Sequence, residues 1–233
     1  MTRTLLLFDI DGTLLLSGGA GIRAMADAGA QLFGDGFSLD GFDLAGKLDP
    51  VIYRELADRH GIDDAHLYHD AFRDLYLSRL RSEIARTAHH VHLMPGILDT
   101  LTELRRRNQQ TNDAQLGLLS GNYRAAVPIK FTVVGLDPAW FQITALGDDA
   151  PSRPELTLLA MRKYEAHWRE KADPKHVVVI GDTPHDVHCA KAHGCVSFCV
   201  ATGRYSIAEL DAAGADIAVE NLSDPTPLFD LIG

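Results

Sequence analysis

The chain has few cysteines and no long apolar run, and these two absences exclude several classes of protein. Its 233 residues hold three cysteines, Cys189, Cys195 and Cys199, an odd count without CxxC spacing. Such a set does not fit a disulfide framework, so we expect a reducing compartment. No segment approaches the roughly 18 uninterrupted apolar residues of a membrane-spanning helix, so we expect no membrane partner.

Basic residues are also scarce, with 22 Lys and Arg against 32 Asp and Glu and a formal net charge of −10. Nucleic-acid-binding domains normally carry a basic face, so we expect no nucleic-acid partner. The basic run Arg105, Arg106 and Arg107 ends an apparent helix, where cations complement the helix dipole. Asp9 and Asp11 interrupt the apolar N-terminal stretch, which therefore does not resemble a signal peptide, and we expect a cytoplasmic protein.

Two carboxylates end the first apolar run, LLLFDIDGTLL at residues 5–15. The run has no polar alternation, which is typical of a strand buried on both faces of a parallel sheet. Asp9 and Asp11 therefore lie at the carboxyl end of that strand, where ligands bind in open α/β sheets. An Asp before Gly also occurs in ordinary turns, so this motif alone leaves both interpretations open.

The rest of the chain predicts an α/β fold in two domains. Apolar segments that alternate with helical patterns predict a Rossmann-like parallel sheet core with helices on both faces. The expected strands are residues 115–121, 176–182, 196–203 and 216–222, and helices are expected to start near Gly96, Tyr123, Pro154, Asp186, Ser206 and Pro225.

An all-helical cap domain is expected to interrupt this core. Helical patterns occupy residues 17–34, 51–60 and 65–86, with no strand signal among them. We predict a core of residues 1–15 and 91–233 and a cap of residues 16–90, which leaves the sheet just after Asp11 and hangs over its carboxyl edge.

Polar residues follow further predicted strands and would meet Asp9 and Asp11 at that edge. They are Ser120, Gly121 and Asn122, then Arg153 at a helix start, then Asp182 and Asp186. Clustered carboxylates repel one another unless a hard cation such as Mg²⁺ lies among them. The pattern therefore favours phosphoryl transfer on a small phosphomonoester.

In this hypothesis Asp9 is the nucleophile and Asp11 the general acid and base. Ser120 and the backbone N–H groups of Gly121 and Asn122 would bind phosphoryl oxygens, and Arg153 would offset their charge. Asp186 has an alternative role as the cap of the helix that follows it.

The motifs FDIDGTLL, LLSGN, the basic residue before Pro154 and VIGDTPHDV, in this order, resemble the haloacid dehalogenase superfamily. MPGILDTLTEL, GLDPAWF and VATGRYSIAEL resemble its phosphoglycolate phosphatase group. The resemblance implies the same roles for Asp9, Asp11, Ser120 and Arg153, and a metal site of Asp9, Asp11, Asp182 and Asp186. Most relatives have Lys where this chain has Arg153.

Substrate choice is expected to lie in the cap. Gly21 could let backbone approach a ligand or could only loosen the linker. Lys47 resembles a residue in a loop that faces the active site in related enzymes, which implies that it could bind a substrate carboxylate or second anion. Solvent exposure is the alternative for Lys47, and a solvated linker is the favoured interpretation of His89, His90 and His92.

Two other functions stay open for the whole chain. A sugar phosphomutase would use the same Asp9 and Asp11 but shield the aspartyl-phosphate from water. A non-catalytic binding or regulatory protein could keep the fold without turnover. The oligomeric state is left open.

Overall fold

A parallel sheet forms the centre of the molecule, described here from a computed structural model that covers residues 3–232. The outer ends of the predicted core, residues 1, 2 and 233, lie outside the described residues. The six strands run in the order β5-β4-β1-β6-β7-β8, and every pairing is parallel. Their bounds are Thr4–Phe8 (β1), Ala114–Leu119 (β4), Ile143–Ala145 (β5), Val177–Gly181 (β6), Val196–Val200 (β7) and Ile217–Val219 (β8).

Helices cover both faces of this sheet, as predicted. Along β1, Leu6 and Phe8 face one hydrophobic cluster while Leu5 and Leu7 face another, because successive side chains of a strand point to opposite faces. The first cluster contains α4 (Ile97–Asn108), α5 (Ala126–Val134) and α9 (Thr226–Phe229), and the second contains α6 (Arg153–Trp168) and α7 (Pro184–Lys191). α8 (Ile207–Ala212) packs beside α7. Within residues 3–232, no helix combines the length and apolar character needed to cross a membrane.

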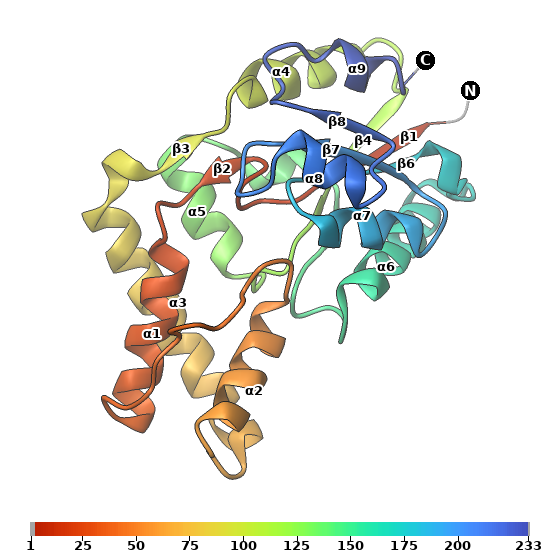
Figure 1. Cartoon of the computed structure of the whole chain (residues 1–233). Coiled ribbons are helices and arrows are strands. Elements are labelled where there is room, and N and C mark those ends of the chain that lie inside the picture. The colour runs from red at the N-terminus through yellow and green to blue at the C-terminus, as the bar shows by residue number, and fades with distance from the viewer. Residues whose placement is uncertain (1–2, 233) are drawn as a thin grey trace.

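The cap helices lie together beside the sheet, at the lower left of Figure 1. They are α1 (Ala20–Phe33), α2 (Asp49–Arg59) and α3 (His69–Arg86), with short 3₁₀ turns at Ala65–Tyr68 (η1) and Ala88–His90 (η2). These helices share a hydrophobic cluster that includes Ile52, Phe72 and Leu80 and extends to Tyr123 and Ala126 of the core. The predicted domain boundaries stay predictions.

Four local features differ from the sequence-based expectations. β5 was not expected, because three residues are too few to show a pattern. The strand expected at residues 216–222 is only Ile217–Val219, and the helix expected at residues 65–86 begins with the separate turn η1. Finally, β2 (Leu15–Leu16) pairs antiparallel with β3 (His92–Leu93), so that a two-residue ladder joins the strands that enter and leave the cap.

The cap packs tightly on the core at Gly121, just after β4. A Cβ atom on Gly121 would lie 2.1 Å from the Lys47 backbone oxygen. The Gly121 carbonyl also accepts a hydrogen bond from the Asp49 backbone N–H at 2.7 Å. Glycine at this position therefore allows the start of α2 to dock on the core.

We predict that Gly121→Ala destabilises the protein by about 1–3 kcal/mol, the usual range for an overpacked site. The added methyl group must push the residue 47–49 backbone away and lengthen the Asp49–Gly121 hydrogen bond. Urea unfolding measures the change in the free energy of unfolding. Gly36→Ala is the matched control, because a Cβ there meets no atom within 4 Å. Equal stability of the two variants would contradict the prediction.

Candidate functional site

The carboxyl ends of three neighbouring strands bring the predicted site residues together. β1 lies between β4 and β6, so Asp9, Ser120 and Asp182 follow adjacent strand ends. The Asp9 N–H donates to the Ile180 carbonyl at 2.8 Å, which fixes Asp9 against β6. All three residues line a cavity of about 660 Å³ between the sheet edge and the cap. Asp11, Gly121, Asn122 and Arg153 line the same cavity.

Three buried carboxylates lie together at this cavity: Asp9 and Asp182 line it, and Asp186 lies next to them. Asp9, Asp182 and Asp186 each offer an oxygen within 4.8 Å of the other two. Burial, and after it repulsion from Asp9 and Asp186, raises the pKa of Asp182 to about 8. Burial also raises the pKa of Asp9, against the lowering effect of Arg153. The carboxylates repel one another when ionised, and a divalent cation among them would relieve that repulsion. Their oxygens are the hard ligands that Mg²⁺ prefers.

Asp182 is held by the turn that follows β1. The Thr13 hydroxyl donates to the Asp182 carboxylate at 3.2 Å. Gly12 has a φ of 82°, a conformation that favours glycine, and a Cβ there would lie 2.4 Å from the Asp182 carboxylate. Asp11 and Gly12 of the first motif therefore form a turn and also line the site.

Arg153 lies between two of these carboxylates, at the first turn of α6. One terminal nitrogen of its guanidinium is 2.9 Å from Asp9 and 2.5 Å from Asp186. The second Asp186 oxygen accepts hydrogen bonds from the Thr183 N–H at 3.0 Å and the Thr183 hydroxyl at 2.7 Å. Asp186 thus caps α7, as the alternative interpretation expected, and also holds Arg153 beside Asp9. Its role as a metal ligand stays a prediction.

The loop after β4, which belongs to the core, contacts α2 of the cap through hydrogen bonds. Ser120 and Asn122 are buried, and the Asn122 N–H donates weakly to the Ser120 hydroxyl at 3.5 Å. The next N–H, of Tyr123, donates to the Asp49 carboxylate of α2 at 2.8 Å. Burial raises the pKa of Asp49 to about 7.

The sequence analysis missed Lys130, which lies inside the site. Its side chain, on α5, is only 2 % exposed, and the ammonium forms an ion pair with Asp11. The same ammonium donates to the Asn122 side-chain oxygen at 2.7 Å, while Ser17 donates to the other Asp11 oxygen at 3.3 Å. A lone lysine within the apolar helix AVPIKFTVV was the available signal, since Lys is rarely buried without a partner.

The two predicted specificity residues, Gly21 and Lys47, both line the cavity. A Cβ on Gly21 would lie 3.7 Å from the Tyr76 hydroxyl, an ordinary contact. The Lys47 ammonium is 2.5 Å from the Glu55 carboxylate and 4.5 Å from the centre of the Phe42 ring. Their effect on substrate choice stays a prediction.

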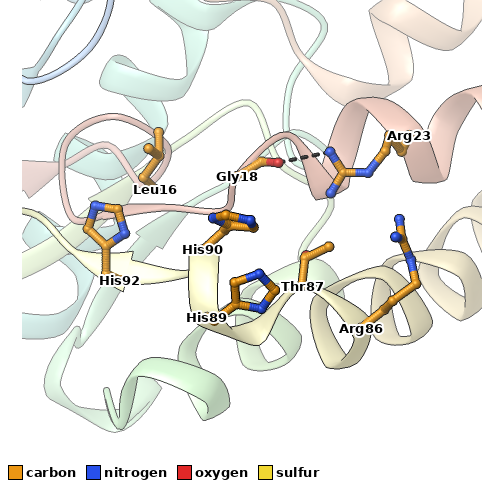
Figure 2. Close-up of a pocket in the computed structure, with 8 residues that line it drawn as sticks. All are labelled: Leu16, Gly18, Arg23, Arg86, Thr87, His89, His90 and His92. Atoms are coloured by element: carbon orange, nitrogen blue, oxygen red, sulfur yellow. Dashed lines mark hydrogen bonds between the residues drawn. The ribbon is translucent and has the colours of Figure 1, made fainter.

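A second pocket, of about 590 Å³, lies at the junction of cap and core (Figure 2). Arg23 donates to the Gly18 carbonyl there, at 2.8 Å. The pocket is lined by Leu16, Gly18, Arg23, Arg86, Thr87, His89, His90 and His92. Among residues 3–232, the one group of three or more possible ligands close enough to share a metal is Asp9, Asp182 and Asp186, so the metal-site hypothesis rests on the cavity rather than on these histidines.

We predict that Mg²⁺ raises the melting temperature more at about pH 9 than at about pH 6, because a metal binds the ionised carboxylates. With its pKa at about 8, Asp182 is protonated at the lower pH in the metal-free protein. The same raised pKa means that the metal-free protein loses stability as the pH rises through about 8. Scanning calorimetry with Mg²⁺ and with excess EDTA measures both effects.

Asp182→Asn should abolish the Mg²⁺-dependent shift, whereas Asp40→Asn, an exposed position outside the cavity, should leave it unchanged. A shift that is the same at both pH values, or that survives in Asp182→Asn, would count against a metal at Asp182.

Comparison with known proteins identifies the family of the chain. The family model described as haloacid dehalogenase-like hydrolase matches residues 6–200. The chain is 27 % identical to a phosphoglycolate phosphatase of Chromobacterium violaceum, over 97 % of this chain and 94 % of that protein. A phosphoglycolate phosphatase of Synechococcus elongatus is 28 % identical, over 94 % and 93 %. A solved haloacid dehalogenase-like hydrolase from Bacteroides fragilis superposes with a TM-score of 0.70 at 25 % identity, over 96 % of this chain and 100 % of that one. The chain therefore belongs to the haloacid dehalogenase-like hydrolase family.

Proposed function

We infer that the protein is a Mg²⁺-dependent phosphatase that hydrolyses a small phosphomonoester through an aspartyl-phosphate intermediate. The observation that carries this proposal is the position of Asp9, which lies on the cavity floor 2.9 Å from Arg153 and within the cluster formed with Asp182. The two relatives named phosphoglycolate phosphatase support phosphate ester chemistry, and they make phosphoglycolate the first substrate to test.

The residues present fit a metal ion, because buried carboxylate oxygens that repel one another form the donor set. Asp9 and Asp182 would hold the ion, with Asp11 and Asp186 completing its surroundings. Bound there, Mg²⁺ would neutralise charge between the carboxylates and a substrate phosphate.

The first chemical step uses Asp9 and Asp11. A carboxylate oxygen of Asp9 attacks phosphorus, the ester P–O bond breaks, and Asp11 gives its proton to the departing alcohol oxygen. Water then attacks the aspartyl-phosphate, Asp11 takes a proton from it, and inorganic phosphate leaves with Asp9 regenerated. The sum is ester plus water to alcohol plus phosphate.

The remaining site residues bind or orient. Ser120 and the N–H groups of the loop after β4 would donate hydrogen bonds to the phosphoryl oxygens, and Arg153 would offset the charge that develops on them. Lys130 forms its ion pair with Asp11, whereas Asp9 pairs with Arg153. Through that ion pair Lys130 fixes Asp11, whose side chain is 40 % exposed. The cap residues that line the cavity would exclude water from these groups once substrate is bound.

A cytoplasmic setting is part of this proposal. All three cysteines are buried free thiols, which a reducing compartment preserves.

The first experiment measures phosphate release from a panel of phosphomonoesters, with Mg²⁺ and with excess EDTA. We expect metal-dependent turnover that Asp9→Asn abolishes and that Asp11→Asn lowers by about 10²- to 10⁴-fold, the range for loss of a general acid or base. Turnover that survives Asp9→Asn would refute the mechanism. Isomerised sugar phosphate with little free phosphate would favour a mutase instead.

Lys130→Met should lower kcat by about 10²-fold, because it leaves the Asp11 carboxylate without its buried donor and free to leave the productive geometry. The pH profile of kcat should shift as well, since the charge beside the proton-transferring group is gone. Lys171→Met, at an exposed position outside the cavity, is the matched control. An unchanged kcat and pH profile in Lys130→Met would remove Lys130 from the catalytic machinery.

A further inference from the structure

The cavity is larger than a two-carbon phosphate ester needs. Its volume of about 660 Å³ falls within the roughly 300–1,000 Å³ of pockets that hold drug-sized ligands. The phosphate-binding groups occupy only the sheet edge. The space toward the cap is therefore available to the alcohol part of the ester.

Apolar side chains line that space on the cap side. Leu16 and Ile22 are large hydrophobic residues that are 40 % and 51 % exposed, and both line the cavity. Phe42 and Leu44 come from the loop before α2 and are partly exposed. Met25 and Ile52 lie behind them and belong to the hydrophobic cluster of the cap. Exposed apolar surface gathered in a cavity indicates a ligand that covers it.

Each cation that lines the cavity already has a carboxylate partner. Lys130 pairs with Asp11, and Arg153 pairs with Asp9 and Asp186.

The other two cations that line the cavity, Lys47 and Arg204, also have carboxylate partners. Arg204 is 3.2 Å from Asp43, and Lys47 is 2.5 Å from Glu55. A second anion on the substrate would have to compete with these carboxylates, and Asp49 adds a further carboxyl group to the same wall. Among residues 3–232, the wall therefore offers a carboxylate or second phosphate no cation that lacks a carboxylate partner.

We propose that the substrate is a phosphomonoester of an alcohol with a substantial apolar part and no second negative charge. This inference rests on the proposed phosphatase function and names the substrate class of the same site. Ile22, Phe42 and Leu44 contact the apolar part of the alcohol, while its phosphate lies at Asp9. Hydrolysis releases that alcohol and inorganic phosphate, with water as the second reactant. Phosphoglycolate, whose leaving group is small and carries a carboxylate, is consequently a poor substrate for this chain.

The experiment compares esters that differ only in the feature at issue. Hexyl phosphate, ethyl phosphate, the phosphate ester of hydroxyhexanoic acid with its terminal carboxylate, and phosphoglycolate are assayed for kcat/KM with Mg²⁺. We expect hexyl phosphate to exceed each of the others by about tenfold or more, since a methylene group alone is worth about 10-fold or more in a fitted apolar pocket.

A matched pair of variants checks the location. Ile22→Lys, at an exposed position on the cavity wall, should lower kcat/KM for hexyl phosphate and raise it for the carboxylate-bearing ester. Leu98→Lys, at a position on α4 that is 48 % exposed and outside the cavity, should leave the ratio unchanged.

The possible failures are distinguishable. Comparable or higher kcat/KM for phosphoglycolate or for the carboxylate-bearing ester would overturn this inference and leave the phosphatase function intact. An unchanged ratio in Ile22→Lys would likewise overturn it. Hydrolysis of none of the esters, with no turnover of the wider panel, would overturn the proposed function and this inference together.

Discussion

Repulsion among buried carboxylates is the constraint on which the site depends. Asp9, Asp182 and Asp186 lie within a few ångströms of one another at the sheet edge, and each is at most 7 % exposed. Isolated buried charges of one sign are strongly unfavourable, so the surroundings must supply compensation. Arg153 provides it from one side by contacting Asp9 and Asp186 with the same nitrogen. The remaining repulsion is the physical reason that a cation fits there.

The surrounding backbone is built around the same carboxylates. Gly12 leaves room for Asp182, and the capping box of Thr183 and Asp186 starts α7 while orienting Asp186 toward Arg153. Elements that stabilise the fold therefore also fix the site. A substitution at one of them would change the stability of the protein and the geometry of the site together, and the two effects must be measured separately.

The cap reaches the site through two different kinds of contact. At Gly121 the backbone of residues 47–49 packs directly on the loop after β4, and the Asp49 carboxyl accepts the Tyr123 N–H. Farther out, the cap presents apolar side chains and neutralised ion pairs to the cavity. The first contact positions the cap on the core, and the proposed choice of alcohol rests on the second; Lys47 and Asp49 take part in both.

The sequence by itself determined most of the sheet, though not β5, and the meeting of Asp9, Asp11, Ser120 and Asp182, because buried apolar strands run parallel and their carboxyl ends share one edge. It could not determine which charged side chains pair. Lys130 contacts Asp11 across 119 positions of the chain, a pairing that depends on how α5 packs beneath the cap. The sequence suggests Lys47 as a possible anion-binding residue, yet its ammonium forms an ion pair with the Glu55 carboxylate. Only the tertiary structure decides such pairings, because they depend on distances between segments that local patterns do not encode.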